Sequence, residues 1–305
     1  MSQAADRSQQ RRHFFCALES RANGEAIFGT VARIRSWLLL EYPGAWRRHA
    51  VEENRDIPQE VKELLQTWQK SGRLDRCLLV RRRHDQTLPL RCFLVQSLLQ
   101  KSYLLSAQLG AYSEISAIWS RAQPALGPLY AVCTHGRHDK CCAKFGLPVF
   151  EEFQRLRPEL SWQCSHVGGD RFAANVVVLP YGIYYGRVTP SDVAAIVART
   201  EQGQVWLRGY RGRSCFGRLI QVAEFFARQE SGRLALDEFA PLERRELSAG
   251  RHQVSLFAPR DKTLHIVEFQ VVPDRIVQRL TCHAAEAVQV PQYELLNYQV
   301  RSAES

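Results

Sequence analysis

Short apolar runs alternate with longer stretches in which apolar residues recur every three or four positions. The short runs predict buried strands at about 34–41, 75–83, 90–97, 129–135 and 160–166. The longer stretches predict helices. One helix begins at Pro58, another covers 142–157 with an interruption near Gly146 and Pro148, and residues 98–126 are also expected to be helical.

The pattern changes toward the C-terminus. The runs 172–180 and 183–188 predict a hairpin, and a helix over 191–200 is expected to begin at Ser191 or Thr189. Residues 205–228 are expected to form a strand, an Arg/Gly loop and a helix, and 229–250 a charged connector. Three alternating strands are then expected, at 252–259, 262–272 and 276–282.

The order of these elements predicts the fold class. The central part reads β-α-β-β-β-α, which is the outline of a thioredoxin-like mixed sheet with flanking helices. The N-terminal part repeats β-α-β-β, so we expect an α/β (α+β) protein with two related halves and a small C-terminal β-module. The expected division is a disordered N-terminus (1–13), an N-terminal α/β half (14–126), a thioredoxin-like domain (127–228) and the β-module (229–305).

Composition is that of a soluble globular protein. The chain has 305 residues, of which 45% are hydrophobic and 24% charged. No uncharged apolar run approaches the roughly 18 residues of a membrane helix. The N-terminus is polar and basic and lacks the apolar core of a secretory signal. We therefore predict a soluble, cytoplasmic protein without a membrane span, with a basic transit peptide as the alternative.

Charge and cysteine content narrow the expected chemistry. The net charge of +10 favours acidic partners, but no long basic stripe interleaves with aromatics, so nucleic-acid binding is not expected. Nine cysteines are an odd number for a disulfide framework. They make up only about 3% of the chain, well below a disulfide-stapled secreted domain. Thiols that stay reduced, some of them binding a metal, fit better.

The stretch from Leu129 to Arg187 concentrates the candidate ligands. Cys133 and Cys142 flank an eight-residue loop, so both thiolates can reach one side of a compact inorganic centre. Cys164 and His166 are two apart and share a face of a predicted strand. Thiolate with imidazole is the ligand set of zinc sites and of Rieske-type clusters. Spacing alone leaves core-filling cysteines as the alternative.

Several longer strings carry a family resemblance. They are WLLLEYPGAW, CTHGRHDKCCAKFG, SHVGGDRFAANVVVLPYGIYYGR and YRGRS, at 37–46, 133–146, 165–187 and 210–214. Between about Cys16 and Glu224 the chain resembles the sucrase/ferredoxin-like family of thioredoxin-like [2Fe–2S] proteins. The resemblance implies a thioredoxin-like fold and a [2Fe–2S] cluster. It implies cysteine ligands at Cys133 and Cys142 and two histidine ligands in an H-x-G-G-H motif.

The chain departs from this motif at its last position. His166 matches the first histidine, but Asp170 stands where the second is expected. Carboxylate is a harder ligand and a poorer match for iron in a sulfide cluster. Three alternatives follow: Asp170 is the fourth ligand, Cys164 or Cys141 replaces it, or the cluster is absent and the fold serves as an interaction protein.

Neighbouring residues have two interpretations each. His135 and His138 are either donors to cluster sulfur or a partner, or solvated loop residues. Arg171 is a candidate to pair with Asp170 and hold it away from iron. A basic loop is either a docking site for an acidic redox partner or a set of solvated arginines: Arg211, Arg213 and Arg218. Two cysteines are interpreted as structural thiols outside the site: Cys215 and Cys282.

The leading functional hypothesis is an electron carrier rather than a substrate-converting enzyme. The chain has no Walker loop, no Ser/His/Asp arrangement and no G-x-G-x-x-G after a strand. The word "sucrase" in the family's name receives no support, since no paired carboxylates stand in a glycosidase setting. A thiol oxidoreductase using the adjacent Cys141 and Cys142 ranks last, because neighbouring cysteines bridge only through a strained ring. The expected partner is a redox protein.

Overall fold

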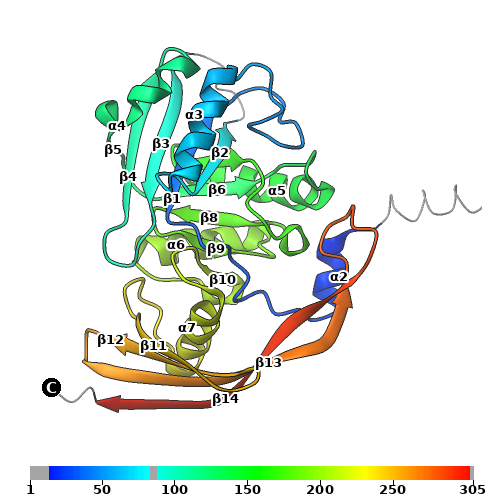
Figure 1. Ribbon diagram of the computed structural model, residues 1–305, viewed down its shortest axis with the longest axis vertical. Helices are drawn as coiled ribbons and strands as arrows, with labels where there is room; N and C mark the ends of the chain where they lie inside the picture. The colour runs from blue at the N-terminus through cyan, green and yellow to red at the C-terminus, as the bar shows by residue number, and fades with distance from the viewer. Residues whose placement is uncertain (1–13, 83–87, 303–305) are drawn as a thin grey trace, which may run out of the picture.

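The computed structural model describes residues 14–82 and 88–302. The predicted disordered segment 1–13 lies outside the described residues. Within the described part, the strands form a ten-stranded mixed sheet and a separate four-stranded antiparallel sheet (Figure 1). Helices flank the large sheet, so the predicted α/β class with a small C-terminal β-module is confirmed.

The N-terminal half builds one side of the large sheet. Strand β1 (Ser36–Glu41) pairs in parallel with β2 (Arg76–Arg81) and antiparallel with β3 (Leu90–Gln96). Strand β3 then pairs antiparallel with β4 (Tyr103–Leu109). Helix α3 (Gln59–Lys70) connects β1 to β2 and places Val61, Leu65 and Trp68 in the core of this half.

The helix predicted over 98–126 is wrong for most of that segment. Strand β4 occupies its first part, because all seven of its residues pair with β3. This pairing overrides the local helical pattern. Only short helical turns and a two-residue strand follow: η1 (Tyr112–Ala117), α4 (Ile118–Arg121) and β5 (Gln123–Pro124).

The C-terminal half of the large sheet repeats this topology. Strand β6 (Leu129–Cys133) pairs in parallel with β7 (Ser161–Cys164) and antiparallel with β8 (Val176–Leu179). Strand β8 pairs antiparallel with β9 (Ile183–Tyr185). Both halves therefore place their strands in the order second, first, third, fourth, with the same directions. This is the predicted thioredoxin-like arrangement in two related halves.

The two halves meet through their second strands. Strands β2 and β7 pair antiparallel, with Val80 opposite Cys164 and Arg81 opposite Gln163. The pairing joins the halves into one continuous sheet. It also brings the end of β7, where His166 follows, to the middle of the sheet.

Helices cover the second half of the sheet. Helix α5 (Lys140–Leu156) runs without a break, so the interruption predicted near Pro148 is wrong. It packs its inner face against β6 together with α6 (Val193–Glu201), which follows the short turn η3 (Pro190–Asp192). This turn begins at Thr189 in a capping box, one of the two starts predicted from the sequence.

The last part of the chain forms the separate sheet. Strand β10 (Tyr210–Arg213) ends the large sheet, after the turn η4 (Leu207–Gly209), and helix α7 (Arg218–Ser231) follows. The four strands of the second sheet are β11 (Ala240–Ser248), β12 (Arg251–Ala258), β13 (Thr263–Gln278) and β14 (Val288–Ser302). Helix α7 packs its apolar side on this sheet.

Two predictions for this part need correction. The connector expected over 229–250 contains β11, whose side chains are mostly exposed and therefore lack an apolar pattern. The two strands expected over 262–272 and 276–282 are one long strand, β13, with a register shift between Val272 and Ile276.

The β13–β14 hairpin extends away from its sheet toward the N-terminal helix α2 (Cys16–Ala22), as Figure 1 shows. Asn23 donates a hydrogen bond to Gln278 over 3.2 Å, and Cys282 approaches Cys16 in the turn of the hairpin. The hairpin turn therefore lies beside α2 and the start of α5. Among the described residues, no helix combines the length and apolar character needed to cross a membrane.

Candidate metal centre

The first two donors lie where β6 ends and α5 begins. Cys133 is the last residue of β6, and Cys142 lies in the first turn of α5. Asp139 caps this helix, and its Oδ1 accepts a hydrogen bond from the backbone N–H of Cys141 over 2.8 Å. Gly146 allows the helix to pass close to the strand, because a Cβ there would lie 2.2 Å from the carbonyl oxygen of Cys133. The predicted helix break at this glycine is thus a close packing contact.

The other two candidate ligands lie in the loop after β7. Gly168 and Gly169 have φ angles of 94° and 81°, a left-handed conformation that turns the chain between His166 and Asp170. Arg211 holds this turn, because it donates hydrogen bonds to the carbonyl of Gly168 over 3.0 Å and to Asn175 Oδ1 over 2.8 Å.

Both interpretations of the basic loop, a docking site and a set of solvated arginines, are therefore wrong for two of its three arginines. Arg211 and Arg213 are each only 2% exposed. Arg213 donates to the carbonyl of Leu236 over 2.6 Å, so both guanidinium groups satisfy backbone acceptors inside the fold. Arg218 alone is exposed.

The fold brings three sequence-predicted donors together. The ligand atoms of Cys133, Cys142 and His166 all lie within 4.8 Å of one another. Asp170 joins them, since its Oδ1 lies 3.0 Å from His166 Nδ1 and accepts from the Cys142 thiol over 3.2 Å. Asp170 is 3% exposed, so the group is shielded from water on this side.

Two more histidines surround this group. The ring of His138 stacks on that of His166 with centroids 3.6 Å apart, and its Nε2 lies 3.9 Å from Asp170 Oδ2. His135 is buried, so a solvated loop histidine is the wrong interpretation for it. Its Nδ1 accepts from the backbone N–H of His166 over 3.2 Å, while its Nε2 lies 2.8 Å from the carbonyl of Arg47. His135 thus positions the His166 backbone.

The charges in this group favour pairing of a His166 cation with the anions of Asp170 and Cys133. Burial alone would lower the pKa of His166, but its pairing with Asp170 and Cys133 raises that pKa to about 9. Burial would raise the pKa of Asp170, but the pairing with His166 lowers it. The neighbouring Cys142 thiol holds the pKa of Cys133 well below its usual value, although burial opposes this. These shifts favour the ionised forms of Cys133, His166 and Asp170.

The other candidates lie elsewhere. Cys164 is opposite Cys133 in the β6–β7 register. Among the described residues, one donor group contains Cys133 and another contains Asp170, and Cys164 belongs to neither of them. Burial raises the pKa of its thiol well above the usual value. Arg171 does not pair with Asp170: its Nε donates to Glu25 over 2.8 and 3.0 Å.

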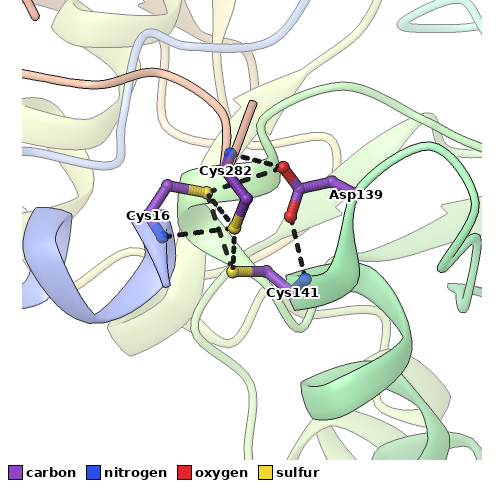
Figure 2. A group of neighbouring side chains, drawn as sticks. All are labelled: Cys16, Asp139, Cys141 and Cys282. Carbon is purple, nitrogen blue, oxygen red and sulfur yellow. Dashed lines mark hydrogen bonds between the residues drawn. The ribbon is translucent and has the colours of Figure 1, made fainter. Parts of the chain in front are cut away.

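Adjacent cysteines in α5 point to different places. Successive residues of a helix are rotated by about 100°, so Cys141 turns away from Cys142. Cys141 lies with Cys16, Cys282 and Asp139 in a second donor group, shown in Figure 2. This separation argues against a vicinal thiol pair. Cys282 is therefore not an isolated structural thiol. Sequence reasoning missed the group because its cysteines are far apart in the chain: Cys16 is 125 positions from Cys141 and 266 from Cys282.

The first group has the chemistry of a metal centre. Two thiols and an imidazole are ligands that iron–sulfur and zinc sites use. The Nδ1 atom of His166 lies 3.0 Å from Asp170 Oδ1, so both atoms face the same point between the two thiols. The ring nitrogen can bind a metal there once it has lost its proton. The residues present thus fit a [2Fe–2S] cluster at three positions, with a carboxylate at the fourth.

The fold and this donor group define a thioredoxin-like α/β protein with a Cys/His metal-type site. The chain belongs to the sucrase/ferredoxin-like family, whose model matches residues 27–212, more than half of the chain. This match covers the donors Cys133, Cys142, His166 and Asp170, but not Cys16 or Cys282.

Individual relatives match shorter parts. Altered inheritance of mitochondria protein 32 from Meyerozyma guilliermondii is 34% identical over 108 residues, which cover 32% of this chain and 38% of the relative. The protein of the same name from Debaryomyces hansenii is 33% identical over 95 residues, covering 28% of this chain and 35% of the relative. The chain thus matches well under half of the length of either relative.

One solved structure also matches a short part of the chain. A variant of the thioredoxin-like [2Fe–2S] ferredoxin from Aquifex aeolicus is 24% identical and covers 28% of this chain and 97% of its own. The TM-score is 0.24, too low to establish a shared arrangement. The thioredoxin-like assignment therefore rests on the strand order and directions described above.

Proposed function

We propose that this protein is a redox protein that carries a [2Fe–2S] cluster and transfers electrons. Cys133, Cys142, His166 and Asp170 are the proposed ligands. The observation that carries the proposal is the convergence of two buried thiols and a half-buried imidazole, whose ligand atoms lie within 4.8 Å of one another. When bound, such a cluster accepts and releases one electron, and imidazole ligation raises its potential relative to an all-thiolate cluster.

Asp170 is the proposed fourth ligand because it already contacts two of the others. Its Oδ1 is 3.2 Å from Cys142 Sγ and 3.0 Å from His166 Nδ1. Cys141 is turned into the second donor group, and Cys164 is absent from both. A carboxylate ligand to iron is harder than imidazole, so we expect a more labile cluster than one with two histidines.

The electron would leave on the side of His138. This side chain is 27% exposed and stacks on His166, which is itself 23% exposed. Arg47, Arg48 and Arg137 are exposed on the segments that adjoin this side. An acidic redox protein would be attracted to these arginines, which replace the buried Arg211 and Arg213 as the docking surface.

An absorption spectrum tests the proposal directly. The protein is purified without oxygen and reconstituted with iron and sulfide, and iron and acid-labile sulfide are assayed on the same sample. Visible charge-transfer bands with about two irons and two sulfides per chain are expected. Cys142→Ser should bleach these bands, while Cys215→Ser should leave them. A wild-type protein that stays colourless after reconstitution contradicts the proposal.

A cluster-free interaction protein is the second candidate. The close pairing of His166 with Asp170 favours it, because an imidazolium held by a carboxylate cannot bind iron until it loses its proton. In that case Cys142→Ser would leave partner binding unchanged, whereas a cluster protein would lose its colour. The Cys142→Ser variant therefore distinguishes the two candidate functions.

The compartment remains a prediction. A cytoplasmic location is the expectation from the sequence. The name of the two fungal relatives refers to mitochondrial inheritance, which makes a mitochondrial location the alternative. Fractionation of cells that express the full chain, with detection of an epitope at its C-terminus, distinguishes the two.

A further inference from the structure

A second group of thiols lies beside the first centre. Cys16 begins α2, Cys141 lies in the first turn of α5, and Cys282 lies in the turn between β13 and β14 (Figure 2). The three Sγ atoms form a triangle: Cys141 is 3.3 Å from Cys282 and 3.6 Å from Cys16, and Cys16 is 3.6 Å from Cys282. The Asp139 carboxylate closes the group, with Oδ2 3.9 Å from Cys16 Sγ.

We propose that Cys16, Cys141, Cys282 and Asp139 bind one Zn²⁺ ion. A tetrahedral zinc site with Zn–S bonds of about 2.3 Å places its sulfurs about 3.8 Å apart. The observed separations of 3.3 to 3.6 Å are close to this value. A disulfide needs about 2.05 Å, and the near-equal sides of the triangle single out no pair of cysteines for one.

The carboxylate indicates the metal. Soft thiolates suit both Cu(I) and zinc, but zinc also accepts an Asp oxygen as a ligand. Asp139 is completely buried. A buried carboxylate is costly unless it is hydrogen-bonded or bound to a cation, and beside three thiols Asp139 offers the oxygen ligand that zinc accepts. The thiols lose their protons to solvent when the metal binds.

Hydrogen bonds already orient the carboxylate. Asp139 Oδ1 accepts from the backbone N–H of Cys141 over 2.8 Å, and its Oδ2 accepts from that of Cys282 over 2.6 Å. Two of the proposed ligand residues thus position a third. Little rearrangement is needed to bring the four ligand atoms, all within 4.8 Å, around one ion.

The ion would link three distant parts of the fold. The apolar cluster at this point contains only Cys16, Ala17, Cys141 and Ala173, with four half-buried neighbours. So small a cluster stabilises the hairpin turn and α2 only weakly. Hydrogen bonds from Asn23 to Gln278 and from the Arg279 backbone to Glu19 also join α2 to the hairpin, and a metal would add bonds from both of them to α5.

The test separates this site from the first centre. A chain with Cys142→Ser has lost a donor of the first group, so zinc bound there is weakened. This variant is treated with a chelator, loaded with Zn²⁺, dialysed and assayed for zinc. One zinc per chain is expected. Adding Cys282→Ser should abolish it, while adding Cys215→Ser, another half-buried cysteine, should retain it. Co²⁺ in place of zinc should give the intense visible bands of a tetrahedral thiolate site.

A second variant protects the test against misfolding. Asp139→Asn keeps a good helix N-cap but removes the anionic ligand, so zinc affinity should fall at least tenfold while the circular dichroism spectrum is unchanged. Zinc content that is insensitive to both Cys282→Ser and Asp139→Asn overturns the proposal. So does a stable disulfide between two of the three cysteines with no zinc uptake after reduction. Neither result depends on whether iron occupies the first centre.

Discussion

Asp170 Oδ1 lies 3.0 Å from Nδ1 of His166, so the residue that replaces an expected second histidine is paired with the first. The same oxygen is 3.2 Å from Cys142 Sγ. The substitution therefore does not leave a gap in the donor group. It places a carboxylate, where the family motif has an imidazole, at a position that still faces the other donor atoms of the group.

Replacing Asp170 by histidine should strengthen the centre. Imidazole matches iron in a sulfide cluster better than carboxylate, and a second imidazole raises the potential. We expect Asp170→His to hold its iron longer than the wild type when exposed to air or chelator, and to show a higher reduction potential. The measurements are the decay of visible absorption with time and protein-film voltammetry. Asp237→His, at an exposed aspartate, is the control.

Equal iron loss from Asp170→His and the wild type would mean that position 170 is not a ligand. His138 would then become the leading candidate for the fourth position. Its Nε2 lies 3.9 Å from Asp170 Oδ2, on the open side of the group.

Cys164 provides a sharp test of the ligand set. It is completely buried and lies opposite Cys133 in the paired strands, yet its thiol is outside the donor group. Cys164→Ser should therefore keep the visible spectrum and the iron content of the wild type, with a stability loss of about 1–2 kcal/mol from a hydroxyl in an apolar site. Bleaching equal to that of Cys142→Ser would instead make Cys164 the fourth ligand.

The strand order of the large sheet could be predicted because local patterns and turn signals agree with it. The runs containing Cys133 and Cys164 are short, apolar and bounded by polar loops, and both became strands. Segment 98–126 was mispredicted because its apolar spacing suits a helix, while pairing with β3 decides the outcome. Strand β4 follows β3 directly and pairs with it along its whole length, and the apolar spacing of β4 alone does not show this pairing.

The candidate site was only partly predictable for the same reason. Cys133 and Cys142 are close in sequence and carry the family motif, so the motif locates them. The role of Arg211 could not be foreseen, because an arginine in a glycine-rich loop looks exposed until the carbonyl of Gly168 and the side chain of Asn175 lie around it. Cys16 and Cys282 meet across 266 positions, which no spacing rule detects.

The metal-free protein should show a pH signature of the His166–Asp170 pair. The pKa of His166 is raised from 6.5 to about 9, so its contribution to stability is complete below about pH 6.5 and is lost as the pH rises toward 9. The pKa of Asp170 is lowered, so its contribution is present above about pH 4 and is lost as the pH falls through the lowered value. The pair should stabilise most between these limits.

Urea unfolding of the cluster-free wild type and of His166→Gln measures this effect. At pH 6 the wild type should be more stable by at most about 3 kcal/mol, the equivalent of the raised pKa. At pH 10 the difference should be small. A stability difference that is the same at both pH values would show that His166 is not protonated in the folded, metal-free protein.

Gly146→Ala should separate the packing of the site from its ligand chemistry. Alanine in a helix interior normally stabilises by about 0.5–1 kcal/mol relative to glycine. Here a Cβ would lie 2.2 Å from the carbonyl oxygen of Cys133, so α5 must move away from β6. That movement should cost about 1–3 kcal/mol in urea unfolding and should lower the iron content, because it separates Cys142 from Cys133. Gly217→Ala, with no atom within 4 Å of the added Cβ, should change stability by less than about 1 kcal/mol and leave iron content unchanged. A Gly146→Ala protein with full iron content would mean that the spacing of the two cysteines tolerates a shift of the helix, and that the close contact at Gly146 serves only the packing of the sheet.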